Sequence, residues 1–355
     1  MLTGLLPYLT LFAGYVCRVL SIRRVDRFFF SIAVVLIVLL AAGREFGPDL
    51  INYQLYYSNA DISNIFTFGL EPGYVGAMVF VKNVLHGDFN VFMFIVNTLT
   101  LISVYSLARK YSANILLTFL IYFSFYFFLY ECTALRQGLA LSFILLSFHS
   151  IIRKKPVLFC ACVLLAFSCH NSAILFLPAY WVAWHLHVQP KAAVIIVLIL
   201  TPLVLVDLSP YISRFFVYFS ASEKYADLYS SAGEYAERVG LTVGVVLKVL
   251  FFALYAFCYN KKSPVEYLLY NLYWFYLLLY MPLSSVAIIS SRGLDYYKIF
   301  DMITLTYVVK NQNTLLRKAA VSLLLLSYTA YSLWGILVEI EEFPSVLQDM
   351  LNVIS

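Results

Sequence analysis

The stretch Glu131-Cys132-Thr133-Ala134-Leu135-Arg136-Gln137-Gly138-Leu139-Ala140-Leu141-Ser142 begins an apolar run that ends at the basic stop Arg153-Lys154-Lys155. The run is of membrane-helix length, so Arg136 enters it as a permanently charged side chain. Such a charge is costly in hydrocarbon unless it meets a counter-charge or a watery cavity, which makes Arg136 a candidate functional residue. The alternative is an arginine that only marks a helix end and reaches the lipid headgroups.

The composition predicts an all-α integral membrane protein. Hydrophobic residues make up 63% of the chain and charged residues only 12%, whereas about 25% is usual in soluble domains. Apolar runs of about 15–20 residues recur along the whole length, and each could cross or nearly cross a bilayer. We therefore expect a single polytopic membrane domain over residues 1–355, surrounded by lipid and without a nucleic-acid partner.

Basic clusters between the apolar runs predict the topology. Positive residues favour cytoplasmic loops, and placing all the basic loops on that side puts both termini outside. This arrangement predicts about 12 transmembrane helices. The expected spans are approximately 2–20, 28–43, 89–108, 112–130, 133–152, 156–170, 172–187, 191–207, 241–260, 266–283, 294–309 and 319–338.

Residues 71–87 do not fit as a further crossing, because a crossing there would invert every later basic loop. Glu71-Pro72-Gly73-Tyr74 places proline where a first helical turn tolerates it, and the helix that follows is short and carries Lys82. We expect an external interfacial or re-entrant helix. The two long external loops are then 44–88 and 208–240.

The first external loop carries candidate sugar-binding residues. Asp49, Tyr53 and Tyr56 recur at helical spacing and would share one helix face. Aromatic faces can stack on pyranose rings, and a carboxylate can accept hydroxyl hydrogen bonds. The alternative is that the tyrosines belong to the interfacial aromatic belt. Because the chain has 29 Tyr and 30 Phe, no single aromatic residue is diagnostic.

Three further positions stand out near the predicted outer face. His170 lies in a polar break between two apolar runs, where an imidazole could act as base or acid, or could simply precede a helix cap. Arg214 shares a helical face with Tyr211 and Tyr218 in the second loop. Arg292 enters a membrane helix from outside, as Arg136 does. The six cysteines form no metal-binding spacing and are interpreted as apolar packing residues. No DxD motif or carboxylate cluster demands Mg²⁺, so we expect no metal site.

Taken in order, these motifs resemble the EpsG family of bacterial exopolysaccharide polymerases, in the Wzy-like branch of GT-C membrane glycosyltransferases. The similarity covers roughly Gly43 to Asp301. It consists of Arg44, Gly47, Asp49 and Tyr53, then Glu71-Pro72-Gly73-Tyr74, then Leu135-Arg136-Gln137-Gly138-Leu139-Ala140, then His170-Asn171-Ser172-Ala173.

The resemblance implies a GT-C-like fold and a multi-pass enzyme of the bacterial cytoplasmic membrane with an outward-facing active site. Its substrates would be undecaprenyl-diphosphate-linked oligosaccharide repeat units of O-antigen, capsule or exopolysaccharide. The growing glycan would pass to an acceptor hydroxyl, with release of the lipid diphosphate. A chain-length regulator protein and a flippase are further expected partners, and no cofactor is expected.

Residue roles follow from the resemblance together with the chemistry. Fixed guanidiniums stabilise the negative charge of a diphosphate leaving group, and a general base takes the acceptor proton. The candidate catalytic residues are Asp49, Glu71 and His170. The candidate diphosphate-binding residues are Arg136, Arg292 and Arg44, and the candidate substrate-binding residues are Tyr53, Tyr56, Tyr74, Gln137, Arg214 and Tyr297.

Two other classes of function remain open at this point. A lipid-linked oligosaccharide flippase also needs buried charges, although the sequence lacks the internal repeats and Gly/Pro-broken midplane helices that are typical of transporters. A membrane sugar acyltransferase could use His170 as its base. Loss of a polymerase should leave single-repeat lipid-linked units outside, loss of a flippase should leave them inside, and loss of an acyltransferase should leave full-length but unmodified polymer.

Overall fold

The computed structural model describes residues 2–43, 49–212, 240–286 and 289–354. These residues form fifteen α-helices and no β-strand, which confirms the all-α prediction. The chain divides into two compact units that are each discontinuous in sequence. The first comprises Met1–His149, Cys160–Asn171 and Asn313–Ser355, and the second comprises Ser150–Phe159 and Ser172–Gln312. The expectation of one membrane domain stays a prediction.

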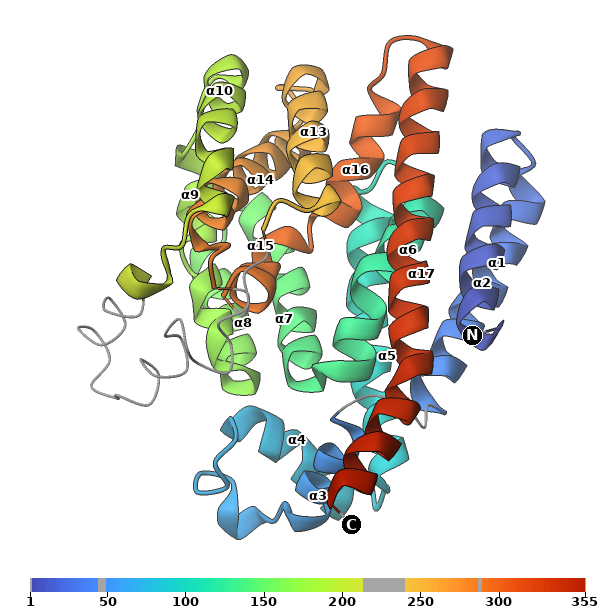
Figure 1. Ribbon diagram of the computed structural model, residues 1–355, viewed down its shortest axis with the longest axis vertical. Helices are drawn as coiled ribbons and strands as arrows, with labels where there is room; N and C mark the ends of the chain where they lie inside the picture. The colour runs from blue at the N-terminus through green and yellow to red at the C-terminus, as the bar shows by residue number, and fades with distance from the viewer. Residues whose placement is uncertain (1, 44–48, 213–239, 287–288, 355) are drawn as a thin grey trace. The chain divides into compact units, whose positions relative to one another are not determined.

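In the first unit, long apolar helices pack side by side. Helices α1 (Leu2–Val19) and α2 (Arg23–Ala42) form a hairpin, and its turn includes Ser21 at a φ of 65° (Figure 1). Helix α1 packs on α6 (Ile115–Tyr122), and helix α2 packs on α5 (Phe89–Tyr111). Helix α6 continues as the π-helix η2 (Phe123–Thr133), which contacts α17 (Leu315–Ile354). The hydroxyl groups of Tyr8 and Tyr15 on α1 form hydrogen bonds with the hydroxyl groups of Thr329 and Ser322 on α17.

Local signals explain where the central helices of this unit begin and end. Asp88 caps α5 by accepting a hydrogen bond from the Val91 amide at 2.9 Å, and Arg109 and Lys110 lie in its last turn. Asn114 caps α6 in the same way. This unit also includes helix α7 (Leu135–Ile152) as far as His149 and helix α8 (Pro156–Cys169) from Cys160 onward.

Two short helices lie together where α5 begins (Figure 1). They are α3 (Leu50–Asn59) and α4 (Pro72–Asn83). Tyr57 of α3 donates a 2.7 Å hydrogen bond to the Gly87 carbonyl, and its ring packs on Phe89 and Phe92. At 1.5 Å per residue, the 12 residues of α4 cover roughly 18 Å, which is too short to cross a bilayer. This agrees with the prediction that residues 71–87 do not cross.

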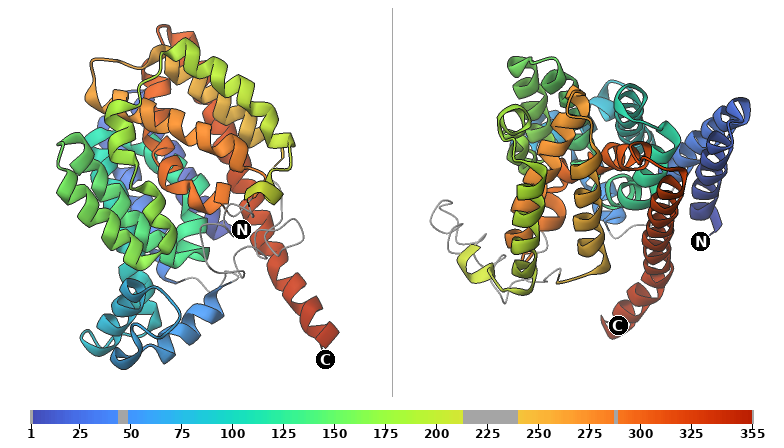
Figure 2. Two further views of the ribbon diagram at one scale, coloured as in Figure 1. Left: turned by 90° about the vertical axis from the view of Figure 1, so that its left-hand side faces the viewer. Right: turned by 90° about the horizontal axis from the view of Figure 1, so that it is seen from above.

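The second unit is organised around α14 (Pro264–Leu283), whose side chains are mostly buried. Asn271 of α14 donates to the Ala183 carbonyl of α9 (Ala179–His185) at 2.8 Å, which ties the two helices together. Helices α10 (Pro190–Leu200) and α13 (Val243–Cys258) lie side by side (Figure 2). The short helices α15 (Asp295–Lys298) and α16 (Asp301–Lys310) pack against α14.

The prediction of about twelve transmembrane helices is wrong as a count of membrane-length helices. Among the described residues, five helices are long and apolar enough to span a membrane, and four further apolar helices are shorter. The expected span 172–187 is divided into the 3-10 helix η3 (Asn171–Phe176) and α9, and the expected span 294–309 is divided between α15 and α16. The five long segments are Val25–Ala42, Phe89–Tyr111, Ile115–Thr133, Leu135–Ile152 and Leu315–Glu339.

Candidate functional site

The candidate site lies in the first unit and begins at the first turn of α4. Glu71 is the residue before the helix, Pro72 occupies the first helical position, and Tyr74 is fully buried. Gly73 is required by a close approach, because a Cβ atom there would lie 2.7 Å from the Ser168 carbonyl oxygen of α8. The Glu-Pro-Gly-Tyr motif therefore seats the start of α4 directly against the end of α8.

The start of α7 places Arg136. The π-helix η2 ends at Thr133, and α7 starts at Leu135, so Arg136 lies in the first turn. A Cβ atom at Gly138 would lie 2.5 Å from the Tyr130 carbonyl oxygen, so glycine lets α7 pack closely on η2. Thr100 of α5 also donates to the Gly138 carbonyl at 3.3 Å. These contacts hold the backbone beside Arg136 in one place.

Glu71 and Arg136 form an ion pair. The Arg136 Nη1 atom donates to Glu71 Oε2 at 2.8 Å, and the Asn171 amide donates to Glu71 Oε1 at 3.2 Å. The side chain of Glu71 is 6% exposed, whereas that of Arg136 is 31% exposed. A guanidinium has five N–H donors, so Arg136 can bind Glu71 on one edge and present another edge to an anion.

The surroundings of Glu71 keep its carboxyl group ionised. Burial raises the pKa of Glu71, but the Arg136 charge, the amides of Glu71 and Asn171, and the charge of His170 together lower it by more, so the pKa lies below its ordinary value. The structure thus brings together three predicted residues, Glu71, Arg136 and His170. Since a carboxylate of low pKa takes up protons weakly, this arrangement suits Glu71 to orienting Arg136.

Aromatic side chains from α3 and α4 flank the ion pair. The Tyr53 hydroxyl interacts with the Arg136 side chain; burial raises the pKa of Tyr53, although the Arg136 charge opposes the change. The Tyr53 ring lies 6.2 Å from the rings of both Tyr56 and Tyr74, centre to centre. Asp49 comes one residue before α3 and contributes to the electrostatic environment of Tyr53. Tyr53 and Tyr56 therefore lie one turn apart on α3, and Asp49 directly precedes that helix.

The other predicted site residues have different surroundings. Gln137 is buried in the first turn of α7. In the second unit, Tyr297 is buried and donates a 2.8 Å hydrogen bond to the Leu175 carbonyl, and Arg292 is an exposed residue of the π-helix η5 (Ile289–Gly293). Arg44 and Arg214 lie outside the described residues. The described residues contain no cluster of three or more His, Cys, Asp or Glu that could hold a metal ion.

Two polar contacts of this unit were not predicted from the sequence. The backbone amide of Asn171 contacts Glu71, and no side-chain pattern can signal a backbone donor. Glu131, five residues before Arg136, is fully buried and accepts a 2.6 Å hydrogen bond from Tyr122. An acidic residue inside an apolar run was a usable signal for Glu131, because buried carboxylates need partners.

A comparison with protein families adds the wider context. The model of the EpsG family matches residues 27–344, which is most of the chain and includes all the residues of the site. The chain belongs to the EpsG family. EpsG proteins form a membrane protein family of exopolysaccharide biosynthesis. No curated protein and no solved structure matches this EpsG-family chain.

Proposed function

We propose that this EpsG-family protein polymerises undecaprenyl-diphosphate-linked oligosaccharide repeat units at the outer face of the bacterial cytoplasmic membrane. The observation that carries the proposal is the Glu71–Arg136 ion pair, in which a buried carboxylate orients a guanidinium that keeps a partly exposed edge. An oriented guanidinium in an apolar chain suits a phosphate-bearing substrate that is itself anchored in lipid.

In the proposed reaction, an acceptor hydroxyl of one repeat unit attacks the anomeric carbon of the donor glycan. A new glycosidic C–O bond forms, the C–O bond to the diphosphate breaks, and the bonding electrons leave with the diphosphate. Arg136 donates hydrogen bonds to the diphosphate oxygens and stabilises the charge that develops there. Tyr56 is partly exposed and would contact the sugars, with the buried Tyr53 and Tyr74 packed behind it. Gln137 is proposed as a further substrate-binding residue.

The acceptor proton needs a base. Glu71, Asp49 and His170 were the sequence candidates, and the low pKa of Glu71 favours a positioning role for that residue. We therefore assign the role of general base to Asp49 or His170. Asp49 has no side-chain bond to the start of α3, so its carboxylate is not engaged in capping that helix.

Further assignments rest on the family resemblance and on chemistry. Arg292 and Arg44 are proposed as additional diphosphate ligands, and Arg214 and Tyr297 as substrate-binding residues. A GT-C-like architecture, a chain-length regulator and a flippase as partners are part of the same proposal.

The test is complementation of a strain that lacks the protein, with Arg136→Lys compared with Arg317→Lys. Arg317 is an exposed arginine in the first turn of α17, so its variant controls for general effects of the substitution. We expect Arg136→Lys to lose polymer and to accumulate single-repeat lipid-linked units on the outer leaflet, while Arg317→Lys resembles the parent. Accumulation on the inner leaflet would indicate a flippase, and full-length polymer without a substituent would indicate an acyltransferase.

A further inference from the structure

A pocket of about 290 Å³ lies among α1, α2, α5 and α6 in the first unit. It is formed where α1 and α5 end and where α2 and α6 begin. The lining includes the charged side chains Arg18, Asp26, Arg27 and Arg109 and the polar residues Ser112 and Asn114. The pocket is therefore a polar site at the shared end of four apolar helices, where a bilayer meets water.

This pocket is separate from the Glu71–Arg136 site. Helix α5 begins with Phe89, and Phe92 in its first turn packs against Tyr74 beside Glu71, whereas Arg109 in its last turn lines the pocket. The 23 residues of α5 span roughly 34 Å at 1.5 Å per residue. The two sites therefore lie at opposite ends of α5, one helix length apart.

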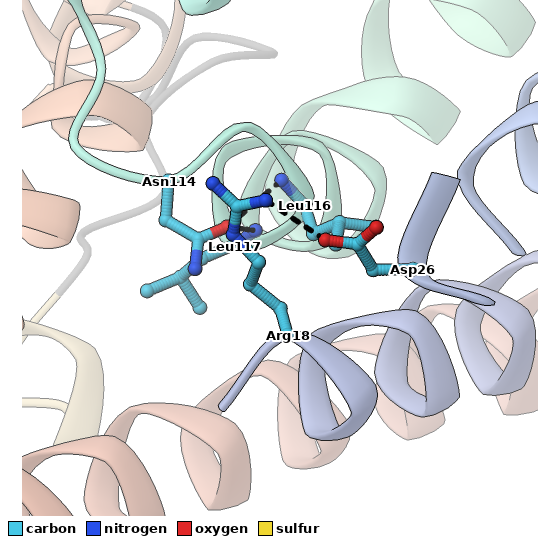
Figure 3. A network of polar contacts seen from close by, with 5 residues as sticks. All are labelled: Arg18, Asp26, Asn114, Leu116 and Leu117. Carbon is cyan, nitrogen blue, oxygen red and sulfur yellow. Dashed lines mark hydrogen bonds and ion pairs between the residues drawn. The ribbon is translucent and has the colours of Figure 1, made fainter. Parts of the chain in front are cut away.

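The charges in the pocket favour an anionic ligand. Three arginines and one aspartate line the pocket. The only ion pair that the described residues form there joins Arg18 Nη1 to Asp26 Oδ2 at 2.9 Å (Figure 3). Arg27 and Arg109 are exposed, so they can turn toward a bound anion at little cost. The first amides of α6 add a positive helix end, although the Asn114 side chain already accepts from Leu116 and Leu117.

Asp26 places a second and independent requirement on the ligand of this pocket. Asp26 is only 2% exposed, yet its Oδ1 atom accepts no hydrogen bond from any described group. An ionised carboxylate is an acceptor only, and a buried acceptor without a donor is costly. A ligand that fills this pocket should therefore bring a hydroxyl or ammonium donor as well as a negative charge.

We propose that this pocket binds the phosphate headgroup of a membrane phospholipid, with Arg18, Arg27 and Arg109 on the phosphate and Asp26 Oδ1 on a headgroup donor. Phosphatidylglycerol offers hydroxyl donors and phosphatidylethanolamine offers an ammonium group. Phosphatidylcholine carries the same phosphate but has no N–H or O–H in its headgroup. The site therefore prefers the first two lipids to the third, and this inference is independent of the polymerase proposal.

The first experiment counts lipids bound to the purified full-length protein in detergent by native mass spectrometry. Phosphatidylglycerol should bind more tightly than phosphatidylcholine, and the double variant Arg27→Gln/Arg109→Gln should weaken phosphatidylglycerol binding about 30-fold. The matched control is Arg317→Gln/Lys318→Gln, which removes two exposed positive charges from the start of α17. Equal binding by the two double variants would overturn the proposal.

A second variant tests the donor requirement. In Asp26→Asn the amide oxygen can stay on Arg18, which places the NH₂ group where Oδ1 was, so a donor would face the headgroup donor. Phosphatidylethanolamine has the same net charge as phosphatidylcholine, and its ammonium group can only donate, so we expect this variant to bind the two lipids equally. A retained preference for phosphatidylethanolamine would contradict the role of Oδ1.

Competition with soluble phosphates identifies the source of the ligand. Neither inorganic phosphate nor glycerol 1-phosphate should displace phosphatidylglycerol when present at the same concentration, because the lipid also gains from its chains along the apolar helices. Displacement at equal concentration would show that the pocket takes a soluble phosphate and would refute the lipid assignment.

Discussion

The Nη1 atom of Arg136 lies 2.8 Å from Oε2 of Glu71, although 65 residues separate the two in sequence. The contact joins the residue that precedes α4 to the first turn of α7. It means that two motifs of the chain, Glu-Pro-Gly-Tyr and Leu-Arg-Gln-Gly, meet in one place.

The ion pair predicts non-additive variants. Glu71→Gln should reduce polymer strongly because Arg136 loses the carboxylate that orients it, and Arg136→Lys should do so because lysine cannot donate in a planar fork. The double variant should be no worse than Arg136→Lys alone, since both changes act on one unit. Polymer yield and length, measured at matched protein levels in the membrane, check this. If the loss of polymer in the double variant equals the product of the losses in the two single variants, Glu71 and Arg136 act separately.

The assignment of the general base predicts that variants of Asp49 and His170 will differ in polymerisation rate. Replacing the true base should lower the polymerisation rate by about 10²–10⁴-fold. Asp49→Asn and His170→Ala, assayed one at a time on purified lipid-linked repeat units, should identify which residue takes the proton. If both variants polymerise at the parental rate while Glu71→Gln and Glu71→Asp are inactive, then Glu71 is the base despite its lowered pKa.

Arg292 gives a prediction in the second unit. If it binds the diphosphate, Arg292→Lys should retain protein in the membrane but lose most polymer, because the bidentate hydrogen bonds are lost while the charge remains. Arg153→Lys, at an exposed arginine just after α7, is the matched control. Normal polymer from Arg292→Lys would remove Arg292 from the set of diphosphate ligands.

Helix α4 offers two glycines for a packing test. Gly73→Ala should destabilise the protein by roughly 1–3 kcal/mol, because its Cβ would meet the Ser168 backbone of α8. Gly76→Ala, in the same helix, has nothing within 4 Å of the new Cβ. That variant should be neutral or stabilising by up to about 1 kcal/mol, because alanine favours a helix. Thermal unfolding of the two variants in detergent compares them directly, and equal midpoints would contradict the close approach.

The lowered pKa of Glu71 sets a pH dependence of stability. A carboxyl group whose pKa is lower in the folded state than in the unfolded state stabilises the fold above its unfolded value of about 4.3. That contribution is lost as the pH falls through the folded-state pKa. The unfolding midpoint of the parent should therefore fall more steeply below about pH 4.3 than that of Glu71→Gln. Parallel curves for the two proteins would show that Glu71 does not contribute.

Much of the helical layout could be predicted because its signals are local. The expected span 133–152 is helix α7 (Leu135–Ile152), and the proline of the Glu71 motif begins α4 as predicted. Apolar length, capping residues and basic stops all act within a few residues of a helix end. The number of membrane-length helices was overestimated because apolar composition alone does not reveal the breaks between η3 and α9 or between α15 and α16.

The sequence by itself determined that this is a helical membrane protein, which family it resembles, and that Arg136 needs a partner, because these follow from composition, motif order and the cost of a charge in hydrocarbon. Only the tertiary structure decided that the partner is Glu71, that the Asn171 amide and His170 support it, and that Asp26 keeps one buried oxygen open at the far end of α5. The physical reason is that helix formation depends on neighbouring residues, whereas pairing of charges depends on which helices pack together.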